Sequence, residues 1–320
     1  MEKQKVLVLG GSGYLGGLLV DKLIRLQFHP VVFDCLLYET RYIKRADFIY
    51  GDIRDTESVL KAAEGCFAVV NMAGIVGDLA ASVNPVLTRD VNYLAVENIA
   101  KRLPKEVKLI HISTCSVYGQ SDEILDENSL TKPLSVYAAT KLASEPVVLN
   151  RGGTIFRLGT VFGLGDEFSR LRADLVVQTM TFRAIKSQCL MVNGGEQWRP
   201  IISTRCVVNY IYEALIKDRP GLFIVAKENT TIKDLAERVA KVIPGTKIVY
   251  TELNFQDARN YRVNTAKADA TFNYRPNITV EEEVLRIAYL VKSGRLKNPE
   301  DPNYSNGTYL GQLYSSGLYK

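Results

Sequence analysis

The segment VLVLGGSGYLG occupies residues 6–16 and joins an apolar run to a glycine-rich turn. The apolar run predicts a buried strand, and the pattern over 14–26 predicts a helix immediately after the turn. Glycine suits such a turn because the chain takes unusual backbone angles, approaches a pyrophosphate closely and packs a helix on its strand. The helix start supplies free N–H groups to the phosphates. The segment therefore predicts a dinucleotide-binding loop with contacts at Gly10, Gly13, Tyr14, Leu15 and Gly16.

Short apolar strands alternate with amphipathic helices through the first half of the chain. Strands that are apolar throughout are buried on both faces, and helices between them predict a parallel sheet. We therefore expect an α/β fold, a Rossmann doubly wound sheet. Pro146 is expected to kink or end its helix. The predicted strands cover 6–9, 31–33, 48–50, 68–71, 109–112 and 154–157, and the helices 14–26, 56–63, 85–103 and 136–149.

The second half has a looser pattern, which predicts a smaller mixed α/β lobe for substrate. Residues 1–158 are assigned to the Rossmann domain, completed by about 200–226, and 159–199 and 227–320 to the lobe. Helices are predicted over 171–186, 207–217, 232–242 and 280–292, and strands over 199–202 and 222–225, the last rejoining the main sheet. The tail 296–320 has no periodicity and is assigned no structure.

Composition narrows the class of protein. Hydrophobic residues make up 47% and charged residues 23%, and no apolar run reaches the ~20 residues that span a bilayer. With no secretory signal, we expect a cytoplasmic protein without a membrane partner. The net charge of +5 is spread along the chain, which argues against nucleic acid. Five scattered cysteines predict free thiols, and only two histidines, His29 and His111, argue against a metal centre.

Two aspartates follow predicted strands near the loop. Asp34 ends the second strand about 20 residues beyond the loop, where a carboxylate accepts hydrogen bonds from ribose hydroxyls and repels the extra phosphate of NADP. This favours NAD. Asp52 and Ile53 follow the third strand and are candidates for an adenine contact, although a simple turn is nearly as good an explanation for Asp52.

Tyr137 and Lys141 are four residues apart in a predicted helix and therefore share one face. A neighbouring ammonium favours the phenolate, which can take an alcohol proton while hydride leaves to NAD. The hydroxyl-rich segment 113–119 ends the preceding strand, where a parallel sheet places its ligands. In isolation the pair could be a surface pair and the segment a loop satisfying its own backbone. Together with the glycine loop, their order indicates catalysis.

These features resemble the extended short-chain dehydrogenase/reductase family, in particular its NAD-dependent nucleotide-sugar epimerases, reductases and dehydratases. The resemblance runs from Lys5 to about Lys292. Its landmarks are the glycine loop, Asp34, Gly51-Asp52-Ile53, Asn71-Met72-Ala73-Gly74, Ser113-Thr114, Val117-Tyr118-Gly119, Tyr137 with Lys141, and Arg157-Leu158-Gly159-Thr160-Val161-Phe162-Gly163.

The resemblance implies roles for particular residues. Thr114, Tyr137 and Lys141 would form the catalytic triad, and Lys141 would also hold the nicotinamide ribose. Ala73 would line the cofactor cleft. A nucleotide-diphosphate sugar would contact Cys115, Ser116, Asp174, Leu175, Arg199 and Arg259, the two arginines clasping the diphosphate. The family commonly dimerises through the helices at 85–103 and 136–149, so a homodimer is expected.

Departures from the family pattern narrow the reaction. Cys115 and Ser116 stand where 4,6-dehydratases carry Asp-Glu, which disfavours dehydration. The stretch 160–184, with Arg170, Arg172, Asp174 and Phe182, is similar to a subgroup acting at C4 of GDP-linked heptoses. We expect hydride transfer at C4 of a nucleotide-linked sugar by a 4-epimerase, 4-dehydrogenase or 4-keto reductase. The alternatives are a dehydrogenase of a non-sugar alcohol or ketone, and a non-catalytic NAD-binding regulator.

Overall fold

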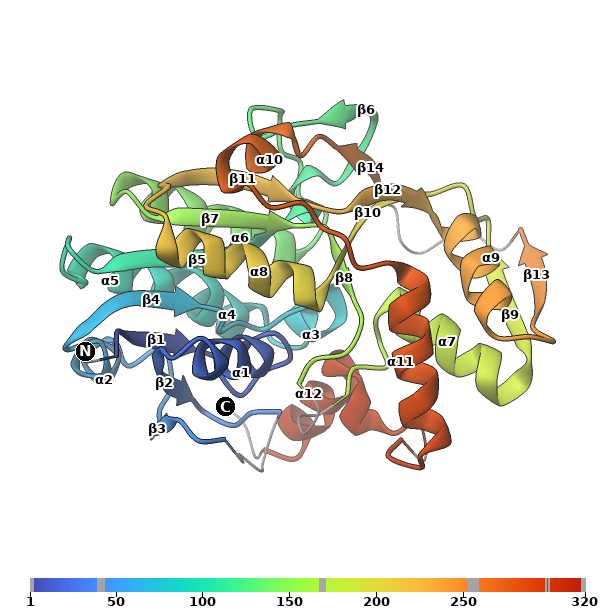
Figure 1. The fold of residues 1–320 in the computed structure, drawn as a ribbon, viewed down its shortest axis with the longest axis horizontal. Helices are drawn as coiled ribbons and strands as arrows, with labels where there is room; N and C mark the ends of the chain where they lie inside the picture. Colours follow the sequence, from blue (N-terminus) through green and yellow to red (C-terminus); the bar gives the residue numbers. More distant parts are fainter. Residues whose placement is uncertain are drawn as a thin grey trace.

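The computed structural model describes residues 3–38, 44–166, 171–252, 259–296, 298 and 300–317. Within these ranges seven strands form one parallel sheet in the order β11-β7-β5-β4-β1-β2-β3 (Figure 1). The order reverses at β1, so the chain winds outward from the middle of the sheet in both directions. The sheet is the predicted Rossmann-like fold. Its strands are β1 Lys5–Leu9, β2 His29–Asp34, β3 Asp47–Tyr50, β4 Cys66–Asn71, β5 Lys108–Thr114, β7 Thr154–Leu158 and β11 Gly221–Val225.

Helices cover both faces of this sheet (Figure 1). One face is covered by α1 Gly16–Arg25, α8 Thr204–Ile216 and α10 Ala266–Phe272. The other face is covered by α2 Thr56–Ala62, α3 Asp78–Val83, α4 Pro85–Arg89, the π turn η1 Asp90–Leu94, α5 Ala95–Arg102 and α6 Val136–Asn150. The predicted strand over 222–225 does rejoin the main sheet, where β11 pairs with β7.

Smaller sheets and further helices build the second lobe. One sheet joins β8 Thr160–Phe162, β10 Trp198–Ser203 and β12 Glu228–Thr231, and the pairs β13–β9 and β14–β6 form two further two-stranded sheets. The remaining strands are β6 Gln120–Leu125, β9 Cys189–Asn193, β13 Lys247–Thr251 and β14 Asn260–Val263. The remaining helices are the short η2 Cys115–Tyr118 and η3 Pro302–Tyr304, with α7 Val176–Ser187, α9 Ile232–Val242, α11 Val280–Lys292 and α12 Asn306–Ser315. None of the described helices is long and apolar enough to cross a membrane.

Two sequence predictions were wrong, one for the start of a helix and one for the tail. The helix predicted over 171–186 begins only at Val176, because Leu175 is extended and the Asp174 carboxylate accepts from Arg172 and from the backbone of Asn306. Pro146 was expected to kink or end its helix; α6 continues past it to Asn150, with buried Glu145 and Val148 on either side. The tail contains η3 and α12, and α12 packs against α3 through tertiary contacts that leave no clear periodic pattern.

A buried ion pair attaches α6 to the sheet. The Arg157 guanidinium on β7 donates to both carboxylate oxygens of Glu145, at 3.0 and 2.6 Å. Ser113, which pairs with Arg157 across the strands, donates to the same carboxylate at 2.5 Å. Since Glu145 is one turn beyond Lys141 on α6, this network fixes the height and rotation of that helix against β5 and β7.

We predict that Glu145→Ala lowers the free energy of unfolding by about 3–5 kcal/mol, because it leaves the buried Arg157 charge without its partner. Chemical denaturation measures the change. Lys101→Ala removes an exposed pair with Glu97 and is the control, expected to change stability by less than about 1 kcal/mol. Equal losses in the two variants would contradict this account of α6.

Candidate active site

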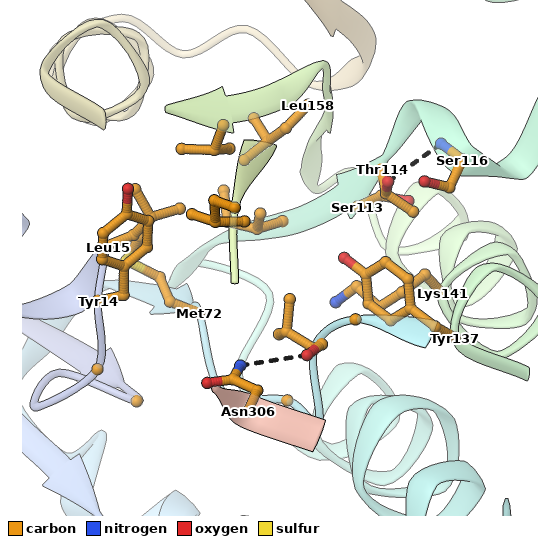
Figure 2. Close-up of a pocket in the computed structure, with 18 of the residues that line it drawn as sticks. Tyr14, Leu15, Met72, Ser113, Thr114, Ser116, Tyr137, Lys141, Leu158 and Asn306 are labelled. Carbon is orange, nitrogen blue, oxygen red and sulfur yellow. Dashed lines mark hydrogen bonds between the residues drawn. The ribbon is translucent and has the colours of Figure 1, made fainter. Parts of the chain in front are cut away.

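A cavity of about 250 Å³ lies at the carboxyl ends of β1, β4, β5 and β7. It opens beside β1, where the order of the strands reverses, which is the place where doubly wound sheets bind ligands. Its walls come from segments far apart in sequence, including the loop after β1, the loop after β4, the end of β5, α6 and the start of α12 (Figure 2). The sheet topology therefore brings these segments together around one cavity.

The glycine loop forms one wall of the cavity, and its backbone is packed too closely for side chains at Gly10 and Gly16. Gly10 has φ +76°, and a Cβ there would lie 2.7 Å from the backbone nitrogen of Ala73. A Cβ on Gly16 would lie 2.0 Å from the carbonyl oxygen of Gly10. The Ser12 hydroxyl oxygen is buried and has no hydrogen-bond partner among the described residues. This orphaned donor and the start of α1 beside it fit a bound dinucleotide phosphate. The predicted contacts Gly10, Gly13, Tyr14, Leu15, Gly16 and Ala73 all line the cavity.

The three other predicted cofactor residues lie outside the cavity lining. Asp34 accepts hydrogen bonds from the backbone N–H groups of Ser12 at 2.9 Å and Leu36 at 2.8 Å, so its carboxylate also shapes the glycine loop. Asp52 is held by the Arg54 side chain at 2.7 Å, which keeps the pKa of its carboxyl below the usual value although burial opposes this. Ile53 is buried in the core. The predicted adenine contact of Asp52 and Ile53 stays a prediction.

Tyr137 and Lys141 extend from α6 into the cavity, opposite Ser113 and Thr114 at the end of β5 (Figure 2). Ser135 begins the helix by accepting a hydrogen bond from Ala138 N, which places Tyr137 in its first turn. Thr114 lines the cavity beside the Tyr137 phenol, and this neighbour lowers the pKa of Tyr137. The structure thus brings together the three residues of the predicted triad.

Burial dominates the protonation of this pair. Burial raises the pKa of Tyr137 to about 12, and the neighbouring Thr114 side chain and the Arg172 charge oppose the rise. It lowers the pKa of Lys141 to about 8, against the opposing effect of Glu145. Both shifts favour the neutral forms. A charge that develops at the phenol oxygen therefore needs stabilisation from groups that touch it.

His111 is a fully buried neighbour of Lys141. Ser144 Oγ donates to the Lys141 carbonyl at 2.7 Å, so it accepts the proton of His111 Nε2 at 3.0 Å. Nδ1 then accepts from the Asn71 amide at 3.2 Å. Burial and the Lys141 charge lower the pKa of His111, which keeps the ring neutral. His111 is therefore a core histidine with both ring nitrogens satisfied, and it packs beneath Lys141, whose Nζ lies 3.4 Å from Nε2.

The residues predicted to contact substrate divide into two groups. Ser116, Leu175 and Arg259 line the cavity. Cys115 does not, because its thiol is fully buried and donates to the Arg157 carbonyl at 3.3 Å, and burial raises its pKa. Sequence reasoning was therefore wrong to place Cys115 beside the substrate.

Asp174 and Arg199 also lie outside the lining of the cavity. The Asp174 carboxylate accepts two hydrogen bonds from Arg172, both 2.9 Å long. Arg199 is buried and donates to the backbone carbonyls of Trp198 and Arg259. Both residues therefore support cavity residues. Arg259 itself lines the cavity, and its guanidinium lies 3.4 Å from an Asp78 oxygen.

Several lining residues were not predicted, among them Arg172, Tyr261 and Asn306. Arg172 belongs to the stretch that resembles the heptose subgroup, and that resemblance could have marked it. Arg170, from the same stretch, lies outside the described residues. Asn306 belongs to the tail, where no local pattern pointed to the cavity.

Comparisons with known proteins identify a family, sequence relatives and a similar solved structure. The model of the NAD dependent epimerase/dehydratase family matches residues 6–226. A putative UDP-glucose 4-epimerase of Methanocaldococcus jannaschii is 24% identical over 303 residues, 90% of this chain and 98% of that protein. The dTDP-4-dehydrorhamnose reductase of Salmonella typhimurium is 30% identical over 64% of this chain and 73% of its own length. The structure of UDP-glucuronic acid 4-epimerase from Bacillus cereus, in complex with UDP-glucuronic acid and NAD, superposes with a TM-score of 0.76, 23% identity, and coverage of 91% and 99%.

We predict that Lys141→Met raises the free energy of unfolding at pH 7 by about 3 kcal/mol, since it removes a buried charge. The pKa of Lys141 is lower in the folded than in the unfolded chain, so the free-energy cost of burying its charge is at its full value below pH 8. This cost falls as pH rises from 8 to 10.5, because the folded chain loses the proton first, and the stability advantage of the variant should shrink over that range. Denaturation at several pH values measures it, with Lys61→Met at an exposed position as the control. A variant less stable than the parent at pH 7 would contradict the prediction.

Proposed function

The chain belongs to the NAD-dependent epimerase/dehydratase family, and from that premise we propose that it transfers a hydride between NAD and C4 of a nucleotide-linked sugar. The observation that carries the proposal is one cavity holding a phosphate-binding glycine loop at one wall and the Tyr137, Lys141 and Thr114 side chains at another. The cavity supplies both the binding of a dinucleotide and a proton acceptor, as alcohol oxidation requires.

The residues of the cleft fit NAD. The loop Gly10–Gly16 would hold the pyrophosphate, with Ser12 Oγ as an additional donor. Asp34 at the end of β2 would face the adenosine ribose and disfavour the extra phosphate of NADP. Lys141 would hold the nicotinamide ribose. When bound, NAD accepts or returns the hydride; the protein supplies the orientation and the proton transfer.

Tyr137 is the proposed acid and base. Its phenol oxygen would take the proton of the sugar hydroxyl as the C–H bond breaks, and would return it in the reverse direction. Because burial raises its pKa to about 12, the phenolate depends on the Lys141 ammonium and on the Thr114 hydroxyl beside it. Thr114 would also hydrogen bond the reacting oxygen and orient it.

The substrate side of the cavity supports a nucleoside diphosphate. Arg259 is the proposed diphosphate ligand, because a guanidinium fork suits phosphate oxygens and this arginine lines the cavity. Buried Arg199 would position it by bonding its backbone carbonyl. The names of the relatives place their chemistry at C4 of UDP- and dTDP-linked sugars, which supports the same substrate class here.

We also propose a homodimer through α4, η1, α5 and α6. Val86 and Leu149 lie on these helices and are exposed apolar side chains, as a face covered by a second copy would have.

We predict that Tyr137→Phe abolishes turnover and leaves NADH affinity within about twofold of the parent, since only the phenol oxygen is removed. Tyr289→Phe on the exposed side of α11 is the matched control and should retain activity. NADH fluorescence titration and product analysis by mass spectrometry provide the two readouts. Residual turnover near the parental rate in Tyr137→Phe would refute the assignment.

A further inference from the structure

The C-terminal helix α12 reaches the cavity with its first residue. Asn306 is buried and lies in the cavity wall across from Tyr14 and beside the loop after β4 (Figure 2). Its side-chain amide donates to the Val76 carbonyl at 3.2 Å, and its backbone N–H donates to Asp174 at 2.9 Å. One residue therefore joins the loop after β4 to the segment before α7, which belongs to the second lobe.

α12 touches the cavity wall at a second place. The Tyr309 ring lies 5.7 Å from the ring of Tyr38, a lining residue shortly after Asp34. The next residue, Leu310, is buried in the core cluster under α2 to α6. The helix is therefore fixed from the Tyr38 end of the cavity to the Val76 end.

Asp174, the residue of the second lobe that Asn306 binds, is held by further contacts. Arg172 binds Asp174 through two hydrogen bonds and lies over the ring of Tyr14, 5.7 Å from its centre. The Tyr14 hydroxyl donates to the Gly163 carbonyl at 2.5 Å. A continuous series of contacts thus leads from α12 through Asp174 and Arg172 to the glycine loop.

We propose that α12 is part of the dinucleotide site and acts as a clasp that keeps the dinucleotide bound between turnovers. A dinucleotide that extends from Asp34 past the glycine loop toward Tyr137 would lie against Tyr38, Val76 and Asn306. Its release would require α12 to separate from these walls. The inference takes the identity of the ligand, NAD, from the proposed function; the clasp itself rests on the contacts of α12.

Two glycines of α12 provide a matched pair of variants. A Cβ on Gly307 would lie 2.6 Å from Leu79 Cβ and 3.3 Å from the backbone nitrogen of Ala80, so Gly307→Ala pushes α12 away from α3. A Cβ on Gly311 would find its nearest neighbour, Val83 Cγ2, at 4.0 Å. Both changes replace a helical glycine by alanine, so any gain in helix propensity is shared.

The experiment measures NADH release by stopped-flow fluorescence after a chase with excess NAD, and the NAD and NADH content of each purified protein by mass spectrometry after denaturation. We expect Gly307→Ala to release NADH about tenfold faster than the parent and to carry less cofactor. A tenfold change in release rate is what the loss of one or two hydrogen bonds would cause. Gly311→Ala should match the parent.

A chain ending at Ser305, which lacks α12, is the second variant and should also release NADH faster. Parental release rates in both Gly307→Ala and the shortened chain would overturn the clasp; if the shortened chain does not fold, Gly307→Ala decides alone. A parent protein that binds no NADH would instead contradict the proposed function, so the two failures are distinguishable.

Discussion

The ion pair between Arg157 and Glu145 is the constraint on which the site depends. Two buried charges lose their hydration, and their attraction repays this only with good geometry and further hydrogen bonds. Here Ser113 and Tyr118 supply those bonds from β5 and the segment after it. The main effect of the pair is therefore to position α6 rather than to add stability. It holds the helix so that Lys141 and Tyr137, one and two turns before Glu145, face the end of β5.

The electrostatics of the cavity follow from that position. Placing Tyr137 and Lys141 in a buried cavity favours their neutral forms, and the neutral ring of His111 beneath Lys141 adds no second charge. Arg172 is paired with Asp174, so the cation nearest the Tyr14 ring is already balanced. In the proposed reaction, the negative charge that forms on the Tyr137 phenol oxygen consequently needs stabilisation by bound ligands as well as by the protein.

The parallel sheet, the glycine loop and the Tyr137 and Lys141 pair could be predicted from sequence because local patterns determine each of them. The roles of Cys115 and Arg199 could not, since only tertiary packing turns the thiol of Cys115 toward Arg157 and buries Arg199 under a backbone carbonyl. α12 was missed for a related reason. Its stability comes from Leu310 in the core and from the close approach of Gly307 to α3, which leave little helical periodicity in the sequence.

The most direct test of the central claim is the fate of the hydrogen on C4 of the sugar. The protein would be loaded with NAD and mixed with UDP-, GDP-, dTDP- and CDP-linked hexoses carrying deuterium at C4, and the cofactor and the sugar would then be analysed by mass spectrometry. Hydride transfer at C4 predicts deuterium in the reduced cofactor trapped by acid quenching, or inversion at C4 of the sugar, with at least one nucleotide sugar, and neither with Tyr137→Phe. A product that forms while the trapped cofactor carries no deuterium and C4 keeps its configuration and oxidation state would contradict it.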